Sequence, residues 1–314
     1  MAANPMRIAA LDIGTVTCRL LLAQVEDGRL TELERRCAIT DLGIGVDKTG
    51  VLREDAIERV VAQIAEYLQV VESHRTQQFP DIPIIAMATS ASRDAKNADV
   101  LVGKLRALGV ELSVIEGSRE AALSFRGASC GFEGENLLVA DIGGGSTEIV
   151  LGVGGEAPKL AHSFNIGCRR VTERFLASDP PSIEECEQAR QWVRQQFAPF
   201  FAQARQQGIA IDRIVAVAGT ATSVVSVDKQ MAVYDSDEVH GTRVPASTLR
   251  GIYDHLRALP LEERKQVVGL EPKRAGVIVA GMGILLEVLA AAGCESFTVS
   301  ESDILQGIIL GACE

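Results

Sequence analysis

Apolar residues are grouped along the chain in short runs that end at small, hydroxyl-bearing turns. Three segments share this pattern, residues 8–17, 137–147 and 214–222. An apolar run that stops at Gly, Ser and Thr is typical of a strand entering a tight loop. Between these runs, apolar residues recur at spacings of three and four over residues 54–71 and 183–206, as in amphipathic helices. Strands that alternate with helices predict an α/β fold with parallel or mixed sheets.

The chain also contains an internal repeat. Segments 12–17 and 141–147 align, and each is followed within one or two residues by an apolar run, 20–22 and 149–151. In both, apolar residues precede an aspartate and a turn rich in Gly, Ser and Thr comes after it. This order describes a hairpin rather than a strand-to-helix phosphate loop. The first and second hairpins therefore predict two related domains.

No low-complexity linker marks the domain boundary. We place the boundary after a helix that should begin near residue 118, which gives an N-terminal domain of residues 1–125 and a C-terminal domain of residues 126–302. A final helix over about residues 303–314 is expected to pack back on the N-terminal domain.

Net charge and hydropathy indicate which binding partners and which cellular location suit the protein. The formal net charge of -11 disfavours nonspecific binding to nucleic acid or to a membrane surface, because both attract an excess of Lys and Arg. A polyanionic substrate must then meet a local positive field. No secretory signal is evident, and no apolar run reaches the roughly 18 residues of a membrane span. We therefore expect a cytoplasmic protein.

Cysteine and histidine give little support to metal chemistry. The seven cysteines form no Cys-x-x-Cys pair, which suits free thiols in a reducing compartment. The four histidines include no His-Glu-x-x-His spacing. A metal site, if present, should be built from oxygen ligands.

The strongest chemical signal is the string Asp-Ile-Gly-Gly-Gly-Ser-Thr-Glu at residues 141–148. Successive glycines let backbone N–H groups approach an anion, and neighbouring hydroxyls add donors. The string predicts a phosphate cradle rather than a plain glycine-rich turn. Its candidate phosphate-binding residues are Gly143, Gly144, Gly145, Ser146 and Thr147.

Carboxylates stand at both ends of this string, Asp141 at its entrance and Glu148 at its exit. Hard oxygen ligands of this kind suit Mg²⁺, held directly or through water. We therefore expect Asp141 and Glu148 to bind Mg²⁺.

The first hairpin alone is weaker evidence for phosphate binding, and its similarity to the second hairpin strengthens that interpretation. Its candidate phosphate-binding residues are Asp12, Gly14, Thr15 and Thr17, and the turn at residues 218–221 adds Gly219 and Thr220. Two such loops and this turn resemble the superfamily of actin, sugar kinases and heat-shock chaperone ATPase domains. The resemblance implies two duplicated actin-like (ribonuclease H-like) domains, each with a mixed sheet, and an active site in the interdomain cleft.

Within that superfamily the chain resembles the exopolyphosphatase and guanosine pentaphosphate phosphohydrolase (Ppx/GppA) family over nearly its whole length. The motifs that carry the resemblance are residues 12–20, 88–97, 115–121, 141–148, 165–174 and 239–241. Longer members append helical domains, so this chain is similar to the short, two-domain form. The resemblance implies Mg²⁺-dependent release of orthophosphate from the ends of inorganic polyphosphate, with short chains favoured, and a homodimer.

The resemblance also assigns roles to single residues. Glu120, followed by Ala121, matches the family's general base, which activates the attacking water. Arg93 matches an arginine that contacts phosphate, and its planar fork suits two phosphoryl oxygens at once. Arg170, the better aligned of two arginines that follow Gly167, is a further candidate for binding phosphate.

Three positions depart from the family pattern. Val16 stands where the first loop usually has Asn, Glu116 replaces a Ser, and Arg119 replaces the first Glu of a Glu-Glu pair. Glu116 adds a carboxylate near Glu120, so the residues alone leave the choice of base open.

Other activities fit the same motifs. Guanosine pentaphosphate is an alternative substrate, and a kinase or ATPase of the superfamily would share the paired loops. A non-catalytic sensor of polyphosphate or of an alarmone would not need the carboxylates Glu120, Asp141 and Glu148.

Overall fold

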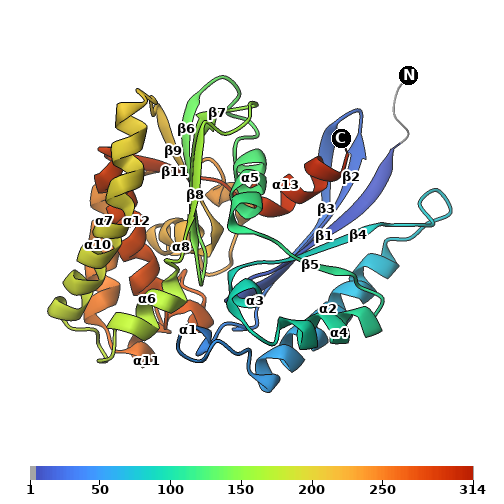
Figure 1. Cartoon of the computed structure of the whole chain (residues 1–314), viewed down its shortest axis with the longest axis horizontal. Coiled ribbons are helices and arrows are strands. Elements are labelled where there is room, and N and C mark those ends of the chain that lie inside the picture. The colour runs from blue at the N-terminus through green and yellow to red at the C-terminus, as the bar shows by residue number, and fades with distance from the viewer. Residues whose placement is uncertain (1–4, 314) are drawn as a thin grey trace. The chain divides into compact units, whose positions relative to one another are not determined.

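The computed structural model describes residues 5–313 (Figure 1). Two compact units divide the chain, Met1–Gly127 with Ile304–Glu314, and Ala128–Asp303. The division falls two residues beyond the boundary placed from the sequence at residue 125.

The first unit is built on a five-stranded mixed sheet in the order β3-β2-β1-β4-β5. The strands are β1 (Met6–Ile13), β2 (Thr17–Glu26), β3 (Arg29–Ile39), β4 (Ile84–Ala88) and β5 (Leu112–Val114). Strands β1, β2 and β3 are antiparallel, whereas β1, β4 and β5 run parallel. The first hairpin is therefore β1–β2, in the middle of the sheet.

Helices cover both faces of this sheet. They are α1 (Val46–Thr49), α2 (Glu54–Ser73), α3 (Ser90–Asp94), α4 (Ala98–Ala107), α5 (Gly117–Ala128) and α13 (Ile304–Ala312). Leu20 and Leu22 of β2 lie in the apolar cluster that contains residues of α2 and α4. Leu21 lies in the other cluster, with Ile308 of α13. Because side chains alternate between the faces of a strand, burial on both faces explains the unbroken apolar run.

The second unit has a six-stranded mixed sheet in the order β10-β11-β9-β6-β7-β8. The strands are β6 (Asn136–Ile142), β7 (Thr147–Val153), β8 (Leu160–Phe164), β9 (Arg213–Val217), β10 (Arg243–Pro245) and β11 (Ser296–Val299). The second hairpin is β6–β7, and β8 continues it as an antiparallel edge strand. The predicted α/β fold with a mixed sheet in each of two units is confirmed.

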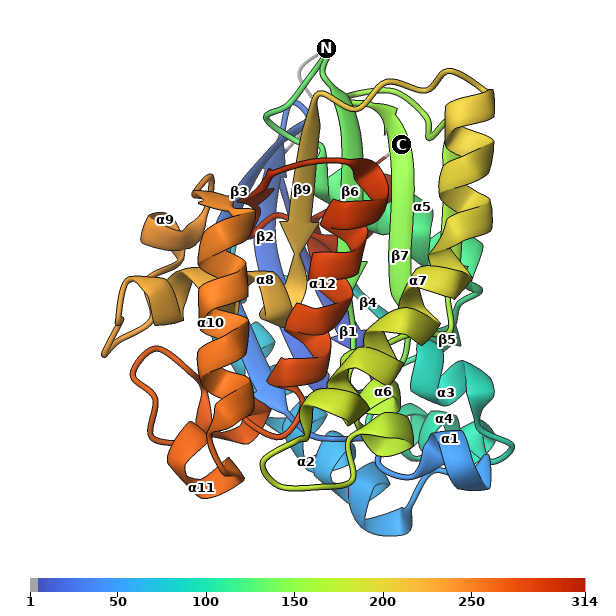
Figure 2. The ribbon, with the colours of Figure 1, turned by 90° about the vertical axis from the view of Figure 1, so that its left-hand side faces the viewer.

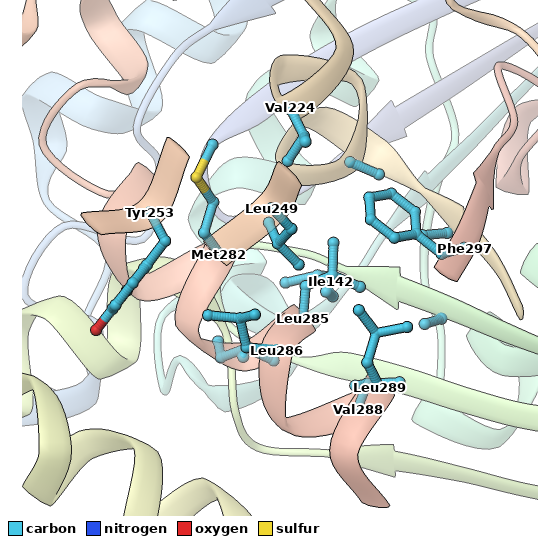
Figure 3. Packing of buried hydrophobic residues seen from close by; sticks show 14 of the residues in the cluster. Ile142, Val224, Leu249, Tyr253, Met282, Leu285, Leu286, Val288, Leu289 and Phe297 are labelled. Atoms are coloured by element: carbon cyan, nitrogen blue, oxygen red, sulfur yellow. The ribbon is translucent and has the colours of Figure 1, made fainter. Parts of the chain in front are cut away.

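The helices of the second unit are α6 (Cys168–Phe175), α7 (Ile183–Gln206), α8 (Ala218–Asp228), α9 (Ser236–Val239), α10 (Ala246–Ala258), α11 (Leu261–Arg264), the 3-10 turn η1 (Pro272–Arg274) and α12 (Ile278–Ala292). Of these, α6, α7, α8 and α10 pack against α12, the most apolar helix of the unit. Every residue of α12 from Ile278 to Leu289 is buried, as expected of a helix that is apolar on all sides. Figure 2 shows α7, α10 and α12 side by side on one face of the sheet. Figure 3 shows Leu285 and Met282 of α12 among their apolar neighbours.

One charged residue belongs to this buried helix. The carboxylate of Glu287 accepts hydrogen bonds from Arg190 and Arg194 of α7, each at 2.8 Å from Nε. Two guanidinium groups thus neutralise the buried charge and tie α12 to α7. No helix in the described part of the chain is both long and apolar enough to cross a membrane.

Gly307 generates a test of the packing between α13 and α5. A Cβ atom there would stand 1.9 Å from the carbonyl oxygen of Leu123. Gly307→Ala should lower the free energy of unfolding by about 1–3 kcal/mol, because a backbone atom cannot move aside without shifting a helix.

Gly103 of α4 is the control, since a Cβ there would meet no described atom within 4 Å beyond its chain neighbours and the nearby backbone of its own helix. Gly103→Ala should raise stability by about 0.5–1 kcal/mol through helix propensity alone. Urea unfolding of both variants measures the difference. Equal stabilisation by the two alanines would contradict the α5–α13 contact.

Candidate active site

Backbone hydrogen bonds fix the orientation of the glycine loop, Gly143–Gly145. The carbonyl oxygens of Gly143 and Gly144 accept from the backbone N–H groups of residues 168–170 at 2.8–3.2 Å, and Gly145 accepts from Arg170 Nε at 2.9 Å. In a trans peptide the N–H points away from the carbonyl. The N–H groups of residues 144–146 therefore point away from α6, and no acceptor for them lies within residues 5–313. They are available to an anion, as a phosphate cradle requires.

This arrangement depends on Gly167, which precedes α6. A Cβ there would stand 2.2 Å from the carbonyl oxygen of Gly144 and 2.4 Å from the nitrogen of Gly145. Only glycine permits so close an approach of the two backbones. Gly167 thus allows the start of α6 to hold the glycine loop, with Arg170 as an added clamp.

The hydroxyl residues of the loop are both buried. Ser146 is 2% exposed, and Thr147, at the start of β7, is fully buried. The Thr147 hydroxyl donates to the carbonyl oxygen of Ile166, which uses its single proton. Its side chain thus braces the loop and has no proton left for a phosphate.

Asp141 and Glu148 face each other across the second hairpin. They are a directly opposed pair in the β6–β7 register, and they are 6% and 1% exposed. Opposed residues of antiparallel strands project from the same face with Cβ atoms about 4.5–5.5 Å apart. The register therefore brings two buried carboxylates together.

The residues near this pair fit Mg²⁺ better than a metal that needs an all-protein cage. Within residues 5–313 no group of three or more His, Cys, Asp and Glu side chains is placed to hold a metal ion. Magnesium, however, is usually bound by one or two carboxylates, and substrate phosphates and water complete its shell. Two facing carboxylates beside an anion cradle match that donor set.

The first hairpin repeats the backbone of the second with different charges. Gly14 N–H donates to Thr17 O at 2.9 Å, as Gly143 does to Ser146 O at 3.0 Å. Opposite Asp12, however, the register places Arg19, whose Nη2 lies 2.7 Å from Asp12 Oδ2. The first hairpin thus holds an ion pair where the second brings two carboxylates together.

The loop of the first hairpin is hydrogen-bonded to the loop that follows β3. The carbonyl oxygens of Thr15 and Val16 accept from backbone N–H groups between Thr40 and Gly43 at 2.8–3.0 Å. The Thr15 hydroxyl is buried, and no described residue hydrogen bonds to it. A buried hydroxyl in this state is suited to a polar ligand. Thr17 begins β2 and is half-buried.

Glu120 and Arg93 are in direct contact. Arg93 Nη1 donates to Glu120 Oε2 at 2.9 Å and to the carbonyl oxygen of Ile115 at 3.0 Å. Glu120, in the first turn of α5, is 7% exposed, whereas Glu116 just before the helix is exposed. The structure therefore separates the two carboxylates that the sequence left as alternatives, because only Glu120 is buried against a guanidinium.

The residues after β9 begin helix α8 rather than the turn expected from the sequence, and they lie under a guanidinium. Ala218 has φ of 65°, a left-handed conformation that is rare outside glycine. A Cβ on Gly219 would stand 1.5 Å from Nη1 of Arg274, so the guanidinium lies directly on this glycine. Thr220 is 3% exposed, and its Oγ1 lies 2.5 Å from where a Cβ on Gly281 would stand. Its hydroxyl is thus packed against α12.

Arg19 and Arg274 are two residues beside these loops that were not expected from the sequence. Aligning the two hairpins places Arg19 at the position of Glu148, so the repeat carried a signal for it. Arg274 lies in η1, outside every repeated or motif segment, and the sequence carried no comparable signal.

Cys18 of β2 lies in the first hairpin, next to Arg19, and its thiol is not activated as a nucleophile. Burial, and second the nearby charge of Asp12, raise the pKa of its thiol well above the ordinary value. The thiol therefore stays protonated and packs as an apolar side chain.

The Asp12–Arg19 pair generates a stability prediction. Arg19→Met removes the guanidinium from a carboxylate whose side chain is 5% exposed. We expect a loss of about 3 kcal/mol, at the low end for a broken buried pair because Arg19 itself keeps some exposure. Arg106→Met, in the exposed Arg106–Glu111 pair, should cost less than about 1 kcal/mol. Denaturant unfolding measures the free energy of unfolding of both variants. Equal losses would show that burial does not make the Asp12–Arg19 pair more stabilising than the exposed pair.

Comparison with known proteins identifies the family of the chain. A model of the Ppx/GppA phosphatase family matches residues 21–314. The chain is 38% identical to Exopolyphosphatase 2 of Mycobacterium tuberculosis, over 97% of its own length and 98% of that protein's. The crystal structure of the Aquifex aeolicus member of the Ppx/GppA family aligns with a TM-score of 0.80 at 31% identity, covering 98% of each chain.

A further crystal structure agrees in fold alone. An exopolyphosphatase from Cytophaga hutchinsonii aligns with a TM-score of 0.88 over 98% of each chain, at 24% identity. The fold and the family resemblance expected from the sequence are both confirmed. The chain therefore belongs to the Ppx/GppA phosphatase family, a family of hydrolases.

Proposed function

We propose that this protein is an Mg²⁺-dependent exopolyphosphatase, which hydrolyses the terminal phosphoanhydride bond of inorganic polyphosphate and releases orthophosphate. The observation that carries the proposal is the glycine loop, whose N–H groups point away from α6 next to the facing carboxylates Asp141 and Glu148. An anion cradle joined to a pair of hard oxygen ligands suits a phosphoryl group and its metal. The name of the M. tuberculosis relative supports polyphosphate as the substrate.

In the proposed reaction, water is the nucleophile and Glu120 is the base. The water oxygen bonds to the terminal phosphorus as the bond to the bridging oxygen breaks, and a proton of the water passes to the Glu120 carboxylate. The shortened chain leaves with the bridging oxygen. Phosphoryl transfer of this kind depends mainly on positioning and charge stabilisation, which the N–H groups of residues 144–146 and the Arg93 guanidinium provide.

Arg93 has the geometry for two tasks. Nη1 is used by Glu120 and Ile115, while Nε and Nη2 have no acceptor in the part of the chain that the structure describes. That edge of the guanidinium suits two phosphoryl oxygens. Arg93 would then hold the base and the reacting phosphoryl group on opposite sides of one planar group.

Asp141 and Glu148 are the residues that would hold Mg²⁺. When bound, the ion would neutralise charge on the phosphoryl oxygens. The N–H groups of residues 144–146 would donate to phosphoryl oxygens. A homodimer and a cytoplasmic location complete the proposal.

The first experiment measures orthophosphate release from polyphosphates of defined length, with Mg²⁺ and without nucleotide. We expect release, faster per chain with short polyphosphate than with long chains. Guanosine pentaphosphate and ATP with a phosphoryl acceptor are the parallel substrates. Turnover confined to either of them would overturn the polyphosphate assignment, and a strong preference for the longest chains would overturn the length preference.

A second experiment tests the base. Glu120→Gln keeps the size of the side chain and removes its basicity, so turnover should fall by about 10²- to 10⁴-fold while substrate binding persists. Glu116→Gln is the matched control, four residues earlier and exposed, and should change turnover little. Reversed effects would move the base to Glu116, and two active variants would exclude both carboxylates.

A further inference from the structure

Three polar residues form a row across the strands of the second unit. In the β6–β7 register Asp141 is opposite Glu148, and in the β7–β8 register Glu148 is opposite Ser163. Opposed residues on antiparallel strands share a face of the sheet, so all three project from one face. Ser163 thus lies on the side of Glu148 that is away from Asp141.

Ser163 is bonded directly to Glu148. Its hydroxyl donates to Glu148 Oε1 at 2.7 Å. Ser163 is half-buried on β8, and Glu148 is 1% exposed. A hydrogen bond to a buried carboxylate is strong, because the acceptor carries the charge and water is largely excluded.

We infer that Ser163 is a positioning residue, which holds Glu148 in the orientation that binds Mg²⁺. This inference depends on the proposed metal role of Asp141 and Glu148. A glutamate side chain has several rotamers, and the carboxylate of Asp141 repels it. The Ser163 hydroxyl occupies one oxygen of Glu148 from the far side, so the carboxylate is held in one orientation before the metal arrives. Outer partners that orient metal ligands in this way typically change metal affinity by about 10- to 100-fold.

The test compares Ser163→Val with Ser163→Thr in the full-length protein. Valine and threonine have the same shape and both suit a strand, so the pair differs in the hydroxyl alone. Mn²⁺ titration, followed by the electron paramagnetic resonance signal of the unbound ion, measures metal affinity without substrate. Ser163→Val should weaken Mn²⁺ binding about 10-fold or more, whereas Ser163→Thr should bind nearly as the wild type does.

Turnover gives a second readout. In Ser163→Val the Mg²⁺ concentration for half-maximal phosphate release should rise, and kcat at saturating Mg²⁺ should recover, because the inferred effect of the Ser163 hydroxyl is exerted through Glu148. Ser226→Ala is the control. Its hydroxyl donates to the carbonyl oxygen of Gly269 at 2.6 Å in the same unit, and its loss should leave Mn²⁺ affinity unchanged.

Glu148→Ala separates failure of this inference from failure of the proposed metal site. If Glu148→Ala loses Mn²⁺ binding and Ser163→Val does not, the inference about Ser163 is overturned and the metal site stands. If Glu148→Ala also binds normally, both are overturned. Equal weakening by Ser163→Val, Ser163→Thr and Ser226→Ala would mean that general destabilisation is responsible, which also overturns the inference.

Discussion

The hydrogen bonds between the start of α6 and the glycine loop are the interaction on which the site of the second unit depends. They satisfy the carbonyl oxygens of Gly143–Gly145, and this turns the N–H groups of residues 144–146 outward. The bonds form because Gly167 has no side chain to separate the two backbones. The outward direction of these N–H groups therefore depends on two segments, because a glycine-rich turn alone would leave its N–H groups without a fixed direction.

The two hairpins have the same turn conformation but carry different charged side chains on the strands beside it. The Gly14–Thr17 and Gly143–Ser146 bonds are equivalent, which shows that the repeat extends to the backbone. The residue opposite the aspartate then decides the charge, because Arg19 makes an ion pair and Glu148 adds a second carboxylate. A duplicated hairpin thus gives one loop with a paired charge and one with two facing carboxylates.

The features of the fold that depend on residues close together in the sequence could be predicted. The hairpins, the α/β order and the helix at residues 183–206 follow from apolar spacing and turn residues, which act over a few positions. Contacts between distant segments could not be predicted in this way. The packing of Thr220 against Gly281, like the bond from Ser163 to Glu148, depends on how strands and helices meet, which spacing along the chain does not specify. The family resemblance identified Glu120 and Arg93, but the ion pair between them became visible only in the structure.

That ion pair has a consequence for how a carboxylate can work beside a phosphate. A base and a phosphoryl group that share one water molecule are both negative, and their repulsion opposes the approach that in-line attack needs. Arg93 donates from Nη1 to Glu120 while its Nε and Nη2 edge has no acceptor among the described residues. A guanidinium placed between the two anions would offset their repulsion and set their separation. Lysine has a single charged nitrogen on a flexible stem, so it would not hold two anions on separate edges of one rigid group.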